Sequence, residues 1–198
     1  MSRTSFIIPT SNKWLIEQIK IFKIYTGITK EQTYLKVILY SAVSQHNLDK
    51  EFRMKFENLD YCEIVKDTYK GHRERKYLDI PENFYKKIND IASYTNDSMS
   101  NVILKLIYLE LRRAYGGVNH DKAFNSKELH EYTTGYKKNT EKKLNVTIRD
   151  ISLPMKNIIM DMSEELCINE NDVIKWLLHE YFSEYYSNYF EKSFITDR

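Results

Sequence analysis

Three proline-terminated phrases at nearly equal intervals constrain the fold of this chain more than any other feature. The 198 residues include only three prolines, and these lie 72 and 73 residues apart. Each proline closes a phrase of the form apolar–any–apolar: Phe6-Ile7-Ile8-Pro9, Leu78-Asp79-Ile80-Pro81 and Ile151-Ser152-Leu153-Pro154. Because recurrence at a fixed period is typical of repeat architectures, we expect three copies of one structural unit.

Two helical patterns follow each proline, separated by a short break. In the second copy, Phe84, Ile88 and Ile91 keep the spacing of one helix face. A longer apolar helix follows, and we expect Gly116 and Gly117 to end it. The expected breaks and caps are Gly27 with a Thr29–Gln32 capping box in the first copy, Asn96 to Ser98 in the second, and Asn169 in the third.

The repeat divides the chain into three units joined by two connections. In the first connection Phe52, Phe56 and Leu59 lie at helical spacing, so we expect a linking helix there. The second connection is polar and poor in large apolar residues, which is typical of a linker. The predicted boundaries are 1–47 for unit 1, 48–74 for the helical linker, 75–115 for unit 2, 116–142 for the polar linker, and 143–198 for unit 3 with an aromatic C-terminal helix.

Composition excludes several classes of protein. Apolar residues make up 42% of the chain and charged residues 29%, which is enough to bury a core. Five glycines and three prolines are too few for the turns of an all-β sandwich. No apolar run approaches the roughly 18 residues that a membrane span needs. The first residues also lack the layout of a secretion signal, so a cytoplasmic protein without membrane contact is expected.

Catalytic, metal and cofactor sites are not predicted. The two cysteines lie 105 residues apart, and the five histidines show no metal-ligand spacing. Neither a nucleophile-elbow motif nor a phosphate-binding glycine loop is present. The run from His72 to Arg75 matches the H-x-x-R of tyrosine recombinases, but the rest of that catalytic domain does not fit into this chain. We therefore expect a protein that is not an enzyme.

A short strand ending in Leu-Pro or Ile-Pro and followed by two helices resembles the ribbon-helix-helix (MetJ/Arc-type) family of DNA-binding proteins. The likeness is clearest at 75–115, good at 144–182 and weakest at 4–43. The resemblance implies a mainly α fold with short β-strands, in which strands of two units pair as an antiparallel two-stranded ribbon. In that family the ribbon enters the DNA major groove, and the start of each second helix holds a backbone phosphate.

Pairing of units also follows from elementary physics. A strand of about six residues cannot stand alone, because its unpaired N–H and C=O groups need a partner strand. Three units per chain leave one without a mate, and pairing across a two-fold axis would supply it. We therefore expect a homodimer with six units and three ribbons. The sequence leaves open which two units pair within the chain.

Alternation along each strand predicts which residues face the DNA. Leu78 and Ile80 are expected to point inward in the second strand. In the third strand we place Val146 and Ile148 inward, because counting back from Pro154 would expose Ile148. The outward residues predicted to contact bases are Arg3 and Ser5 in the first strand, Arg75 and Tyr77 in the second, and Asn145, Thr147 and Arg149 in the third.

These residue types suit major-groove edges. Arginine binds guanine O6 and N7, asparagine binds adenine N6 and N7, and threonine contacts a thymine methyl group. Two outward positions fit less well: Asp79 would face a polyanion, although a carboxylate can accept from cytosine N4, and Ile7 can contact only a methyl group. A first unit that serves dimerisation and does not contact DNA is therefore an alternative.

Positive charge gathers just before the second and third strands. Residues 161–198 have a net charge of −6 and the remainder +8. Lysines and arginines near a ribbon would contact phosphates, and free N–H groups and hydroxyls at helix starts could do the same. Solvated loops and ordinary helix capping are the competing explanations. The predicted phosphate contacts are Lys142, Lys143, Arg73, Lys76, Ser98, Ser100, Thr29 and Lys30.

The function expected from this resemblance is sequence-specific binding of double-stranded DNA at repeated half-sites. The role would be that of a plasmid transfer-origin accessory factor or a transcriptional repressor, associated with the nucleoid or a plasmid. Expected partners are double-stranded DNA, a second copy of the chain, and a relaxase or other plasmid protein. Two alternatives remain open: a helical protein–protein adaptor with no DNA contact, and a DNA-processing enzyme.

Overall fold

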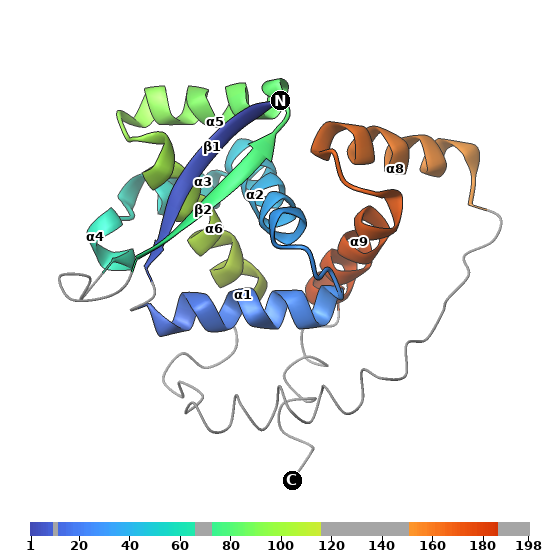
Figure 1. Ribbon diagram of the computed structural model, residues 1–198, viewed down its shortest axis with the longest axis horizontal. Helices are drawn as coiled ribbons and strands as arrows, with labels where there is room; N and C mark the ends of the chain where they lie inside the picture. Colours follow the sequence, from blue (N-terminus) through green and yellow to red (C-terminus); the bar gives the residue numbers. More distant parts are fainter. Residues whose placement is uncertain (10–11, 66–72, 116–150, 186–198) are drawn as a thin grey trace, which may run out of the picture.

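The protein is mainly helical, with one two-stranded antiparallel sheet (Figure 1). The computed structural model describes residues 1–9, 12–65, 73–115 and 151–185. The mainly α class with short strands is thus confirmed. In chain order the elements are β1 (Ser2–Pro9), α1 (Lys13–Thr26), α2 (Glu31–Leu48), α3 (Lys50–Asn58), α4 (Tyr61–Ile64), β2 (Arg73–Ile80), α5 (Glu82–Thr95), α6 (Met99–Tyr115), α8 (Leu153–Leu166) and α9 (Glu170–Tyr185).

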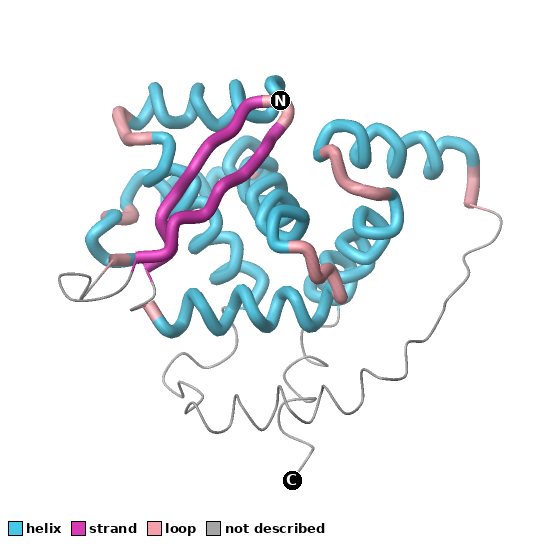
Figure 2. Tube along the Cα trace, in the orientation of Figure 1, coloured by secondary structure: helices cyan, strands magenta, loops and turns pink. Residues whose placement is uncertain are grey.

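The two strands come from distant parts of the chain and pair antiparallel. Ser2 lies opposite Ile80 at one end of the pair, and Pro9 lies opposite Arg73 at the other. Figure 2 shows the strands side by side in magenta, forming a two-stranded ribbon. The sequence left open which strands pair within the chain, and the structure pairs the first expected strand with the second.

One face of the ribbon is buried against helices. Thr4, Phe6 and Ile8 of β1 are buried, as are Leu78 and Ile80 of β2. These positions alternate along each strand, so they share one face of the sheet. That face packs on α2 and α6, over which the ribbon runs in Figure 1.

A helix, a residue in the left-handed conformation and a longer helix recur three times, and we call each such pair of helices a helical hairpin: α1–α2 is the first, α5–α6 the second and α8–α9 the third. Helices α1, α5 and α8 each have 14 residues. They end at Gly27, Asn96 and Cys167, whose φ angles are 64°, 55° and 47°. Glycine adopts this conformation freely and asparagine tolerates it, whereas cysteine rarely does. Gly27 and Asn96 are the breaks expected from the sequence.

The start of α2 differs from the expectation. The helix begins at Glu31 after Lys30, which makes no side-chain capping bond, so the Thr29–Gln32 capping box is wrong. Gln32 instead donates from Nε2 to Asp79 Oδ2 on the ribbon, at 3.3 Å. A contact with a distant strand thus replaces the local cap. In the third hairpin Asn169 caps α9 as expected, because its Oδ1 accepts from the Asp172 N–H at 2.9 Å.

Helices α2 and α6 pack on each other at the centre of the core. Ile38 of α2 and Ile107 of α6 are fully buried there. The first connection contains helix α3, whose Phe56 is also fully buried. Helices α8 and α9 lie beside this part (orange to red in Figure 1) and contact α1, α2 and α6. Among the helices in the described ranges, none combines the length and the apolar character needed to cross a bilayer.

Candidate nucleic-acid interface

The outer face of the ribbon presents six side chains as three cross-strand pairs. These positions alternate with the buried ones, so the outward face expected for the first two strands agrees with the structure. Tyr77 is 46% exposed at the centre of the face. The pairs, each with one residue from β1 and one from β2, are Arg3 with Asp79, Ser5 with Tyr77, and Ile7 with Arg75.

Asp79 lies between a cation and a hydrogen-bond donor. Arg3 Nε lies 3.7 Å from Asp79 Oδ1, and Gln32 donates to the other carboxylate oxygen. The Arg3 guanidinium also lies 5.0 Å from the centroid of the Tyr77 ring. Pairs this exposed contribute little to stability, about 0–1 kcal/mol. They matter more for the electrostatic potential of the outer face, because the Asp79 carboxylate, which would repel DNA, lies beside the positive charge of Arg3.

Arg75 lies at the opposite end of the outer face. Its side chain is exposed next to Ile7 of the paired strand. Within the described ranges it makes no hydrogen bond or ion pair, so the guanidinium donors are directed to solvent. The arrangement leaves one arginine engaged by its neighbours and one able to bind a ligand. Arg73 lies at the start of the same strand, and its side chain is outside the described residues.

Lys76, expected to contact a phosphate, is engaged within the protein. Its side chain is 14% exposed, and its Nζ bonds Glu31 at 2.6 Å and also contacts Glu74. Burial alone would lower the pKa of Lys76, but the two carboxylates outweigh burial and raise it. Lys76 lies within β2 opposite the buried Phe6, so its side chain is not on the outer face of the ribbon, and the sequence spacing did not show this. Nor did the spacing reveal the carboxylate that α2 brings to this lysine.

The start of α2 adjoins the ribbon. Its first two residues, Glu31 and Gln32, contact Lys76 and Asp79 of β2. The preceding Thr29 and Lys30 are exposed at the same helix end. Lys30 is therefore a cation beside the ribbon at a helix N-terminus, where backbone N–H groups favour an anion.

The start of α6 differs in chemistry. Ser98 is exposed, and its Oγ accepts from the Asn101 N–H at 3.2 Å, which is ordinary capping. Ser100 is half-buried and is the second residue of α6. The predicted contacts of the third unit, namely Lys142, Lys143, Asn145, Thr147 and Arg149, lie outside the described residues and stay predictions.

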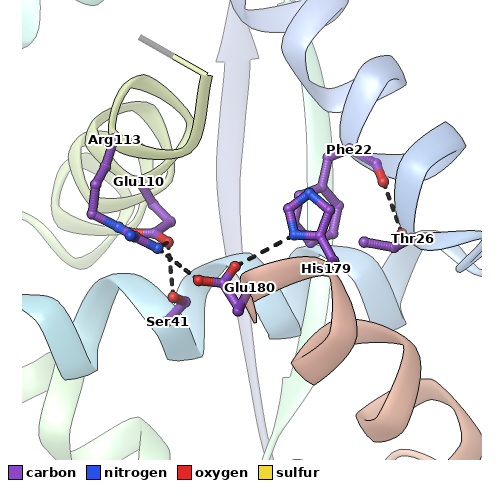
Figure 3. Close-up of polar contacts among 7 residues, drawn as sticks. All are labelled: Phe22, Thr26, Ser41, Glu110, Arg113, His179 and Glu180. Atoms are coloured by element: carbon purple, nitrogen blue, oxygen red, sulfur yellow. Dashed lines mark hydrogen bonds and ion pairs between the residues drawn. The ribbon is translucent and has the colours of Figure 1, made fainter. Parts of the chain in front are cut away.

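A buried polar cluster joins α9 to the helices beneath the ribbon (Figure 3). Arg113 of α6 bonds Glu110 on its own helix and Glu180 of α9. Ser41 of α2 donates to Glu110 at 2.8 Å. His179 of α9 lies 3.5 Å from Glu180, and its ring is 5.0 Å from that of Phe22 in α1. The only sequence signal for this cluster was the glutamate that interrupts the apolar stretch of α6.

Burial and partners move the pKa values of the two carboxyl groups in opposite directions. Burial raises the pKa of Glu110 above its ordinary value, and Arg113 and Ser41 offset this only in part. Burial would also raise the pKa of Glu180, but His179 and Arg113 outweigh it and lower the pKa. Glu110, Ser41 and His179 are buried and Arg113 is partly exposed, so the cluster lies at the edge of the junction between α9 and the core helices, and its geometry serves to position α9.

Within the described ranges no group of three or more potential metal-ligating side chains comes together. We also compared the chain with known proteins, and no protein-family model, curated protein or solved structure matches it.

Proposed function

We propose that this chain is a sequence-specific double-stranded DNA-binding protein built from tandem ribbon-helix-helix units. The observation that supports this most directly is the β1–β2 ribbon, which has one face buried and one polar, arginine-bearing face exposed. A two-stranded ribbon fits the width of the major groove, and side chains on its outer face then reach base edges. Arg75, Tyr77, Arg3 and Ser5 are the proposed base-contacting residues of this ribbon.

Phosphate contacts would flank the ribbon. Lys30 and Thr29 lie at the exposed start of α2 beside β2. In the third unit we propose that Lys142 and Lys143 contact phosphates, and that Asn145, Thr147 and Arg149 contact bases. Contacts with phosphates fix the position of the protein on the duplex, and contacts with bases select the sequence.

The DNA-binding test is selection of duplexes from a random pool by the full chain, followed by binding measurements at several salt concentrations. The logarithm of the affinity should fall linearly with the logarithm of salt concentration, by about 0.9 for each phosphate neutralised. A flat salt dependence, or no duplex bound at low salt, would contradict DNA binding and favour the helical adaptor.

We also infer that the chain works as a homodimer, because α8 and α9 expose apolar residues that have buried counterparts in the other hairpins. Met155 lies 12 residues before the left-handed Cys167 and is 60% exposed. The residues 12 before Asn96 and Gly27 are Phe84 and Leu15, and both are fully buried.

The second helix shows the same contrast. Leu178 lies 11 residues after Cys167 and is 47% exposed, whereas its counterparts Ile107 and Ile38 are fully buried where α6 meets α2. The first two hairpins cover each other, and nothing in the described part of the chain covers this face of the third. A second copy of the third hairpin would cover it across a two-fold axis.

The biological role proposed is that of a plasmid transfer-origin accessory factor or a repressor, associated with a plasmid or the nucleoid in the cytoplasm. A relaxase or another plasmid protein is the proposed further partner. This role is supported by the family resemblance. Footprinting on the natural DNA that contains the selected sequence would separate its forms, since an operator overlaps a promoter and a transfer origin flanks a nicking site.

A further inference from the structure

The β1–β2 ribbon is formed by two different strands of a single chain, so its outer face has no two-fold symmetry. We propose that this ribbon recognises an asymmetric base sequence and binds its site in one orientation. The inference rests on the proposed DNA binding and adds to it the kind of sequence that is read.

The cross-strand pairs define the asymmetry. In a ribbon of two identical strands, the central pair would consist of two identical residues, and the outer pairs would match when the ribbon is turned by a half-rotation. Here the central pair is Ser5 with Tyr77. One outer pair joins two opposite charges, Arg3 and Asp79, and the other joins an aliphatic residue to a cation. The two ends of the face therefore present different chemistry to DNA.

Arg75 makes its end of the face the more selective one. Its guanidinium makes no hydrogen bond or ion pair to a described residue, so both edge donors can bind guanine O6 and N7. Ile7, directly opposite, can contact a thymine methyl group. At the other end the Arg3 guanidinium is ion-paired with Asp79 and lies over the Tyr77 ring, so its charge is partly compensated and its position is constrained. A strict guanine requirement at one end only is the expected result.

The N-termini of α2 and α6 also differ in charge, which adds to the asymmetry of the ribbon. Lys30 lies three residues after the left-handed Gly27, ahead of α2. In the second hairpin the corresponding residue, three after Asn96, is the uncharged Met99 at the start of α6. Lys105, further along that helix, is paired with Asp97. A phosphate would meet a cation at the start of α2 and none at the same position of α6. Backbone contacts thus reinforce a single orientation.

Tethered cleavage of DNA tests the orientation directly. Cys62 is exposed in α4. This helix lies next to the Pro9–Arg73 end of the ribbon, as shown by the hydrogen bond of 2.9 Å that Asn12, three residues after Pro9, donates from Nδ2 to the Ile64 carbonyl. An iron–EDTA reagent attached to Cys62 in a Cys167→Ser variant would cut the DNA near that end. The substrate is a short duplex with a single copy of the selected half-site, which accommodates one ribbon.

Cleavage should be at least fivefold stronger at one flank of the site, and reversing the site within the duplex should move it to the other flank. Equal cleavage at both flanks of a duplex that binds specifically would overturn the orientation while leaving DNA binding intact. Failure of the random pool to yield any bound duplex would instead overturn the proposed function.

Base preferences provide a second measurement. Arg75→Ala should reduce discrimination for guanine at one end of the half-site by tenfold or more, and Arg3→Ala should cause a smaller loss at the opposite end. A selected half-site that is palindromic, or equal losses at both ends from either variant, would contradict asymmetric recognition.

Discussion

Arg113 of α6 and Glu180 of α9 form an ion pair with an Nη2–Oε2 distance of 2.7 Å. The same guanidinium bonds Glu110, whose side chain is 3% exposed. A single arginine therefore compensates a buried carboxylate on its own helix and one on the third hairpin. This shared cation links α9 to α6, one of the helices beneath the ribbon.

Removal of that cation should destabilise the fold. Arg113→Ala leaves Glu110 buried without a counter-charge, and we expect a loss of about 2–4 kcal/mol in the free energy of unfolding, less than for a fully buried pair because Arg113 is partly exposed. Urea denaturation followed by circular dichroism measures the loss. The matched control is Arg112→Ala, which removes an exposed guanidinium whose polar contact within the described ranges is with Tyr108. Equal stability of the two variants would show that the cluster does not hold the junction.

His46 should make stability fall as the pH drops below neutrality. It is buried in α2 against the ring of Phe56, and burial lowers its pKa from the ordinary value of 6.5. Below pH 6.5 the unfolded chain takes up a proton that the folded protein resists, so folding loses free energy until the folded pKa is reached. Between pH 7.5 and 5.5 this cost is up to about 1.4 kcal/mol.

Urea denaturation of the wild type and of His46→Gln at both pH values isolates that contribution from those of other groups. The wild type should lose more stability than the variant on acidification. If both lose the same amount, His46 takes up its proton as readily in the folded protein as in the unfolded chain.

Arg75 should determine sequence specificity, while a remote lysine should not. Arg75→Ala is expected to weaken binding to the selected site by about 1–3 kcal/mol and to relax the base preference at one position. Lys50→Ala, at an exposed position of α3, removes one positive charge away from the ribbon and should leave the preference unchanged. Fluorescence anisotropy with single-base variants of the site would distinguish the two. A uniform loss across all sequences from Arg75→Ala would mean that this arginine contacts a phosphate.

Self-association should depend on the exposed apolar face of α8 and α9. Leu178→Asp places a charge at the centre of the proposed contact, so the dimer expected for the wild type should become a monomer in sedimentation velocity experiments. Met54→Asp is the matched control, since Met54 is 52% exposed on α3 and lies outside that face. Circular dichroism establishes that each variant is folded. A wild type that sediments as a monomer, or a dimer that Leu178→Asp leaves intact, would contradict this pairing.

Local features of the fold were accessible from the sequence. Periodicity predicted the helices after Pro81, and the left-handed turns at Gly27 and Asn96 follow from residues that tolerate a positive φ. The alternation of Leu78 and Ile80 gave the outward face of β2 correctly. Each of these signals depends on neighbours within a few residues, which a single sequence contains.

The candidate site was only partly accessible. Arg75, Tyr77, Arg3 and Ser5 could be placed on an outer face, but the pairing of Asp79 with Arg3 depends on a register between strands about 70 residues apart. The same limit explains why the sequence missed the ion pair of Lys76 with Glu31 and the contact of Gln32 with Asp79 at the start of α2. In both contacts the partner is distant in sequence, and no local pattern indicates which residue it is.

The sequence by itself determined that a short strand precedes two helices in each of the first two units, because propensity, capping and apolar spacing act over a single turn or strand. Only the tertiary structure decided that the first strand pairs with the second, that Arg113 joins α6 to α9, and that the third hairpin presents Met155 and Leu178 outward. The physical reason is that strand register and helix packing are set by the total surface buried between segments that the chain brings together only on folding.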